Sequence, residues 1–97
     1  MIMPKLTEES LQALCRSFLL LKSEEECQSF FSDLCTYQEL EALAQRLQVA
    51  RSLMEGKSYL EINRETGVST ATIGRVSRAL QYGSGGYRTV LERLYEK

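Results

Sequence analysis

The sequence contains no histidine and no tryptophan, and it has a single proline. Because histidine is the commonest general base, its absence argues against enzymatic catalysis. The acidic run at residues 24–26 is better explained as the first turn of a helix, where the macrodipole favours negative charge, than as a set of catalytic carboxylates. The glycines at 83, 85 and 86 lack the Lys-Ser/Thr pair that completes a phosphate-binding loop. We therefore do not expect an enzyme.

Cysteine is also scarce. Cys15, Cys27 and Cys35 form no C-x-x-C pair, and with no histidine a single chain falls one ligand short of a tetrahedral zinc site. We expect reduced, mostly buried thiols in a cytoplasmic protein, with no metal and no cofactor. No leader peptide is expected after Met1, and the longest apolar run, at residues 18–21, is too short to cross a membrane.

The chain of 97 residues is 43% hydrophobic and 26% charged, which predicts one globular domain over residues 1–97. Its net charge of −1 hides an asymmetry. Residues 1–55 hold five Lys/Arg and nine Asp/Glu, a net of −4, whereas residues 56–97 hold seven and four, a net of +3. Because the local field guides approach to nucleic acid more than the total charge does, the second part is the candidate for DNA contact.

Apolar residues recur at helical spacing and nowhere alternate as in a strand, so we expect an all-α fold of six short helices. Thr7 is predicted to cap the first helix, through about residue 21. Capping boxes at Ser23 with Glu26 and at Thr36 with Glu39 predict helices to about residues 34 and 55. Residues 57–80 hold two further helices, and residues 87–96 are expected to form the last.

Residues 57–80 have the pattern of a helix-turn-helix. Ser58 and Glu61 predict a capping box for a short helix, Gly67 suits a positive φ at the end of that helix, and Ser69 predicts the cap of a second helix over residues 70–80. Val68 is the expected apolar plug in the turn. The second helix has an apolar face at residues 72, 73, 76 and 80, and an opposite face that begins with small residues and becomes basic. Such a helix can seat its first turn in a major groove of DNA.

The residues expected to contact DNA lie in and around this second helix: Lys57, Asn63, Arg64, Ser69, Thr70, Ala71, Gly74, Arg75 and Arg78. Two residues, Asn63 and Thr66, depart from the tightest form of the motif. Gly74 costs about 1 kcal/mol of helix propensity relative to alanine. We interpret that cost as a sign of close approach to DNA or to a partner helix; the alternative is a tolerated surface glycine.

The first, second and last helices carry apolar stripes beyond what the core of a small motif would use. We therefore expect a homodimer, in which residues 1–56 serve mainly for dimerisation and two recognition helices lie one turn of DNA apart. The alternative is that these stripes form the core of a monomer.

A resemblance to a known family rests on three segments, LCTYQELEALAQRL (residues 34–47), GKSYLEIN (56–63) and TATIGRVS (70–77). They resemble the Trp repressor superfamily, and in particular its YerC/YecD-like group. The resemblance covers residues 30–97 closely and the first thirty only as helices. It implies a six-helix subunit in an intertwined homodimer with two DNA-reading heads.

The resemblance also implies a ligand pocket. Arg46 and Arg75 match the two arginines that sandwich the indole and hold the carboxylate in the Trp repressor, and Thr36 matches a threonine at the edge of the pocket. However, Val76 stands where that repressor has a glycine, and Ala79 where it has a serine. Both changes make the pocket smaller and less polar, so we expect no tryptophan binding and no small-molecule effector. In that case Arg46 forms an ion pair and Arg75 contacts phosphate.

The expected function is therefore that of a sequence-specific DNA-binding transcriptional regulator, a repressor, whose partners are double-stranded DNA and a second copy of the chain, with no membrane. Two alternatives remain open at this point. One is a protein-interaction module that keeps the fold and docks through its acidic first half. The other is a sensor of amino acids or indole compounds with altered ligand specificity.

Overall fold

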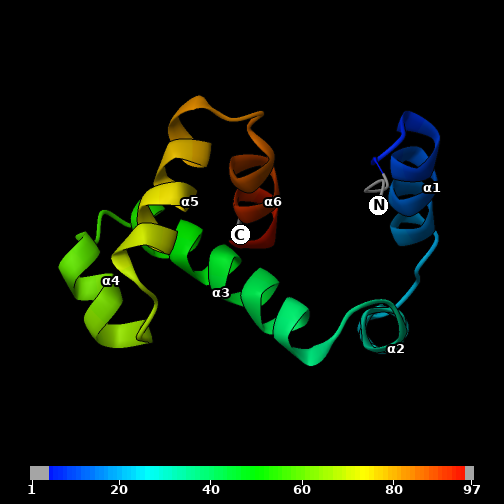
Figure 1. The fold of residues 1–97 in the computed structure, drawn as a ribbon, viewed down its shortest axis with the longest axis horizontal. Helices are drawn as coiled ribbons and strands as arrows, with labels where there is room; N and C mark the ends of the chain where they lie inside the picture. Colours follow the sequence, from blue (N-terminus) through cyan, green and yellow to red (C-terminus); the bar gives the residue numbers. More distant parts are fainter. Residues whose placement is uncertain (1–4, 96–97) are drawn as a thin grey trace. The chain divides into compact units, whose positions relative to one another are not determined.

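The computed structural model describes residues 5–95, and within this range the chain forms six α-helices and no strand (Figure 1). This confirms the prediction of an all-α fold. The helices are α1 (Glu8–Leu19), α2 (Glu24–Leu34), α3 (Tyr37–Met54), α4 (Tyr59–Thr66), α5 (Thr70–Tyr82) and α6 (Gly86–Tyr95). No helix in the described range is long and apolar enough to cross a membrane.

The chain divides into two compact units, Met1–Tyr37 and Gln38–Lys97. In the first unit, the side chain of Thr7 accepts from the Ser10 N–H and so caps α1. The Ser23 side chain caps α2 by accepting from the Glu26 N–H at 3.1 Å. The predicted reciprocal bond is different, because the Glu26 carboxylate accepts from the Lys22 N–H at 2.9 Å rather than from Ser23. The caps thus fix the helix starts, while one half of the second capping box is wrong.

Neither α1 nor α2 contains a buried residue. The ring of Phe18 on α1 meets those of Phe30 and Phe31 on α2 with centroids 5.2 and 5.1 Å away. Around this aromatic contact the apolar stripe of α1 stays open, with Leu11 44% and Leu14 37% exposed. The prediction of mostly buried thiols also fails within one chain, since Cys15 is exposed and Cys27 and Cys35 are only half-buried.

The core of the second unit joins α3, α4, α5 and α6. Its buried side chains are Val49, Ala50, Ile62, Val68, Ile73, Val76 and Leu91. Along α3 only the second half reaches this core, because Leu43 in the first half is 44% exposed whereas Val49 and Ala50 are fully buried. The far end of α6 is held by the Arg51 guanidinium, which lies 3.6 Å over the ring of Tyr95. The core thereby holds α4 and α5 against α3 and α6.

Candidate nucleic-acid interface

The corner between α4 and α5 is defined by side-chain caps, as the sequence predicts. Ser58 Oγ accepts from the Glu61 N–H at 3.1 Å, and the Glu61 carboxylate accepts from the Ser58 N–H at 3.2 Å. This backbone hydrogen bond, together with the hydroxyl of Ser58, lowers the pKa of Glu61, so the cap is ionised at neutral pH. At the start of α5, Ser69 Oγ accepts from the Thr72 N–H at 3.2 Å.

Gly67 makes the turn itself. Its φ is +74°, and its N–H donates to the Asn63 carbonyl to end α4. Residues with a Cβ pay about 1–2 kcal/mol in this left-handed conformation, which explains why a glycine stands here. Inside the corner, Ile62 and Ile73 are fully buried and Val68 is 6% exposed. Each such isoleucine contributes about 1.5–3 kcal/mol by burial, so this apolar contact sets the packing of α5 against α4.

A polar link closes the same corner. Asn63 Nδ2 donates to the Val68 carbonyl at 2.8 Å. Thr66 Oγ1 accepts from the Val68 N–H at 3.1 Å and donates to the Ile62 carbonyl at 2.6 Å. The two residues that depart from the tightest form of the motif therefore satisfy both backbone groups of Val68. The amide of Asn63, predicted as a DNA contact, is already engaged in this link.

The face of α5 that points away from the core carries most of the other predicted residues. Ser69, Thr70, Ala71, Arg75 and Arg78 are all exposed, and Gly74 is half-buried among them. Within residues 5–95, no carboxylate lies at ion-pair distance from Arg75 or Arg78. Small side chains thus occupy the first turn of α5, and two guanidinium groups follow one and two turns later, with their charge available.

The two predicted basic residues outside α5 differ from each other. Arg64 on α4 is exposed. Lys57 Nζ lies 2.9 Å from the Glu65 carboxylate, and the hydrogen bond to Glu65 is the main cause that raises the pKa of Lys57. The charge of Lys57 is therefore partly neutralised within the chain, and it is a weaker candidate for a phosphate contact than Arg64.

Gly74 has room for a side chain. A Cβ built there would lie 3.8 Å from Arg78 Nη1 and 3.9 Å from Tyr59 Cε2, both ordinary van der Waals distances. The chain's own packing does not require a glycine at this position. A methyl group therefore fits at this position, whereas a longer side chain would meet Tyr59 or Arg78.

With this geometry established, comparison with known proteins identifies the family. The family model described as Trp repressor protein matches residues 9–95. The chain belongs to the Trp repressor family. It is thus a member of a family of DNA-binding regulators, and the prediction that it is no enzyme is confirmed.

Individual relatives agree over nearly the full chain. YerC of Bacillus subtilis strain 168 is 53% identical over 92 residues, which cover 95% of this chain and 88% of YerC. The crystal structure of a TrpR-like protein from Eubacterium eligens ATCC 27750 has a TM-score of 0.84 at 47% identity, covering 93% of this chain and 92% of that one. A crystal structure described as a Trp repressor candidate, from Staphylococcus aureus, has a TM-score of 0.87 at 44% identity, covering 94% and 91%.

The residues matched to the tryptophan pocket of the family are not gathered inside the chain's core. Arg46, Arg75 and Thr36 are all exposed. Val76 is 3% exposed and packs in the core cluster of the second unit. Ala79, which stands where the Trp repressor has a serine, is exposed and has no polar atom in its side chain.

Two residues that shape this surface, Thr66 and Tyr59, are not among the predicted contacts. In the sequence, Thr66 stands out only as a departure from the tightest form of the motif, although its hydroxyl bridges two backbone groups. Tyr59 lies outside the motif pattern, although its ring approaches Gly74 on the next helix. A threonine directly before a glycine turn is a local signal that could have revealed the first; the contact of Tyr59 depends on tertiary packing and leaves no such signal.

The polar link predicts the effect of an isosteric change. Asn63→Asp replaces the amide donor with an oxygen that faces the Val68 carbonyl, so the free energy of unfolding is expected to fall by about 1–3 kcal/mol. Urea unfolding followed by circular dichroism measures this effect. The matched control is Gln48→Glu on the exposed side of α3, which is expected to leave the midpoint unchanged. An Asn63→Asp midpoint equal to that of the unsubstituted protein would show that the link contributes nothing.

Proposed function

We propose that this chain is a sequence-specific transcriptional regulator, a repressor, which reads duplex DNA with α5. The observation that carries the proposal is the outward face of α5, with Thr70 and Ala71 in its first turn. Arg75 and Arg78 stand behind them, with no carboxylate of residues 5–95 at ion-pair distance. Membership of the Trp repressor family supports the same function.

The side chains of this face suit distinct parts of a duplex. Thr70 and Ala71 are small enough to let the helix end enter the major groove, and both can contact a thymine methyl group. Guanidinium groups bind phosphate oxygens or the guanine edge with paired hydrogen bonds. Arg64 on α4 and the hydroxyl of Ser69 supply further donors for the backbone, because the first helix of such a motif crosses the phosphates. Lys57 and Asn63 contribute less, since both have partners within the chain.

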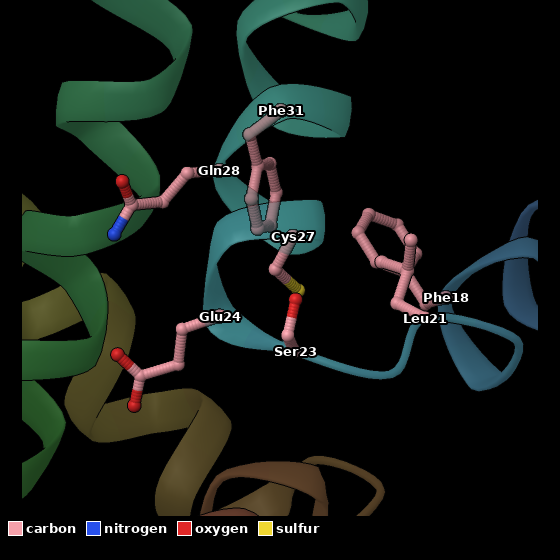
Figure 2. Close-up of a pocket in the computed structure, with 7 residues that line it drawn as sticks. All are labelled: Phe18, Leu21, Ser23, Glu24, Cys27, Gln28 and Phe31. Carbon is pink, nitrogen blue, oxygen red and sulfur yellow. The ribbon is translucent and has the colours of Figure 1, made fainter.

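The regulator acts as a homodimer. The support is the first unit, in which α1 and α2 bury no residue. Between these helices a hollow of about 420 Å³ is lined by Phe18, Leu21, Ser23, Glu24, Cys27, Gln28 and Phe31. Figure 2 shows Cys27 and Phe31 on the side of the hollow that faces Phe18 and Leu21, while Glu24 and Gln28 point away from those two residues. A second copy of the chain, with the same apolar stripes, is the occupant that would cover them.

Tryptophan is not expected to control this protein. Burial of Val76 in the core leaves an isopropyl group where the Trp repressor has a glycine, and Ala79 offers no hydroxyl to a ligand amino group. Arg46 and Arg75 are then free for an ion pair and a phosphate contact. Binding to DNA without a corepressor follows from this arrangement. We further propose that the regulator acts in the cytoplasm, where its DNA target would be.

The role of the arginines is tested by the double variant Arg75→Ala, Arg78→Ala in a gel-shift titration at several salt concentrations. Each phosphate contact contributes about 0.9 to the slope of log K against log salt, so loss of two contacts is expected to lower that slope by about two and to weaken binding strongly at low salt. The charge-matched control is Arg16→Ala, Arg93→Ala, two exposed arginines on α1 and α6. Tight binding by the Arg75, Arg78 variant would remove these residues from the interface.

The oligomeric state is tested by sedimentation equilibrium. The expected mass is that of two 11.1-kDa chains. Leu11→Asp with Leu14→Asp, on the apolar stripe of α1, is expected to shift the equilibrium to monomer because it places two charges in the buried interface. Gln12→Asp, on the neighbouring polar side of α1, is the control. A monomer at all concentrations would contradict the dimer.

A further inference from the structure

We propose that Tyr59 is part of the DNA interface and that its phenol hydroxyl binds a backbone phosphate beside Arg78. The inference rests on the proposed function and adds to it a contact from α4. No part of the motif pattern points to this residue.

The geometry begins at Gly74. Tyr59 Cε2 and Arg78 Nη1 both lie within 4 Å of the point where a Cβ of Gly74 would stand. Gly74 is four residues from Thr70 and four from Arg78, so these three positions form one row along the exposed side of α5. A side chain of α4 therefore converges with one of α5 on the row that carries the predicted DNA contacts.

The orientation of the tyrosine follows from which atom makes this approach. Cε2 is bonded to Cζ, the ring carbon that carries the hydroxyl, so the hydroxyl oxygen is two bonds away from the ring atom that approaches Gly74. Tyr59 is 41% exposed, so solvent reaches this residue. A phenol is a neutral donor of one hydrogen bond and has little conformational freedom once its ring is packed.

Gly74 leaves space on α5 for the side chains of Tyr59 and Arg78. Because the glycine has no side chain, the ring of Tyr59 and the guanidinium of Arg78 can share the space above it. A methyl group fits at ordinary contact distances, whereas a longer side chain would have to displace one of them. Tyrosine and arginine are both frequent partners of phosphate oxygens, and such contacts position a protein on the duplex without reading its sequence. The Tyr59 hydroxyl would therefore hold α4 against the phosphate backbone while α5 enters the major groove.

The experiment compares Tyr59→Phe, which keeps the ring, with Tyr82→Phe, which removes a hydroxyl from a tyrosine 83% exposed at the end of α5. Affinity is measured for a selected duplex and for an unrelated duplex, each over a range of salt, along with the thermal unfolding midpoint. Tyr59→Phe is expected to weaken both complexes roughly fivefold to tenfold, the value of one hydrogen bond. The salt slope should not change, because a neutral donor releases no counterion. The unfolding midpoint and all properties of Tyr82→Phe should equal those of the unsubstituted protein.

Each other outcome contradicts either the role of Tyr59, the phosphate contact or the proposed function. Equal affinity of Tyr59→Phe and the unsubstituted protein would overturn the inference and leave the proposed function standing. Loss confined to the selected duplex would overturn the phosphate assignment, since it would indicate a base contact. Loss that follows a lowered unfolding midpoint would assign the hydroxyl to folding instead. Failure of the unsubstituted protein to bind any duplex would overturn the proposed function itself.

Discussion

The packing of Ile62, Val68 and Ile73 around the left-handed turn at Gly67 is the contact on which the outward surface of α5 depends. It fixes how α5 leaves α4, and hence which of its side chains are exposed. Asn63 and Thr66 reinforce the same turn with hydrogen bonds to the backbone of Val68. If this corner were to relax, the small residues and arginines of α5 would remain in the sequence, but they would no longer form one outward row.

The local features of this corner could be predicted from the sequence because their causes are local. Serine caps, a glycine after the last turn and apolar residues at helical spacing act within a few residues of one another, and the structure confirms them at Ser58, Gly67 and Ser69. Helix starts are confirmed elsewhere for the same reason, although Glu26 turns to the Lys22 N–H, an equally close donor.

The features that escaped sequence reasoning depend on contacts between elements. Asn63 is predicted as a DNA contact, but its amide donates to the Val68 carbonyl, a partner that the packed corner supplies. Two further contacts also join residues that are not close in sequence. Lys57 pairs with Glu65, eight residues along the chain, and Tyr59 on α4 approaches Gly74 on α5. The thiols were expected to be buried because cysteine usually is, yet α1 and α2 contain no buried residue. Its exposed apolar stripes are what the proposed second copy would cover.

Selection of binding sites from a pool of random duplex DNA tests most directly whether the exposed row of α5 reads sequence. We expect enrichment of a two-fold symmetric motif whose half-sites are separated by one helical turn, ~34 Å, because two equivalent recognition helices would then enter successive major grooves on one face of the duplex. Recovery of a pool with no enriched motif, from protein that is folded by circular dichroism, would contradict it.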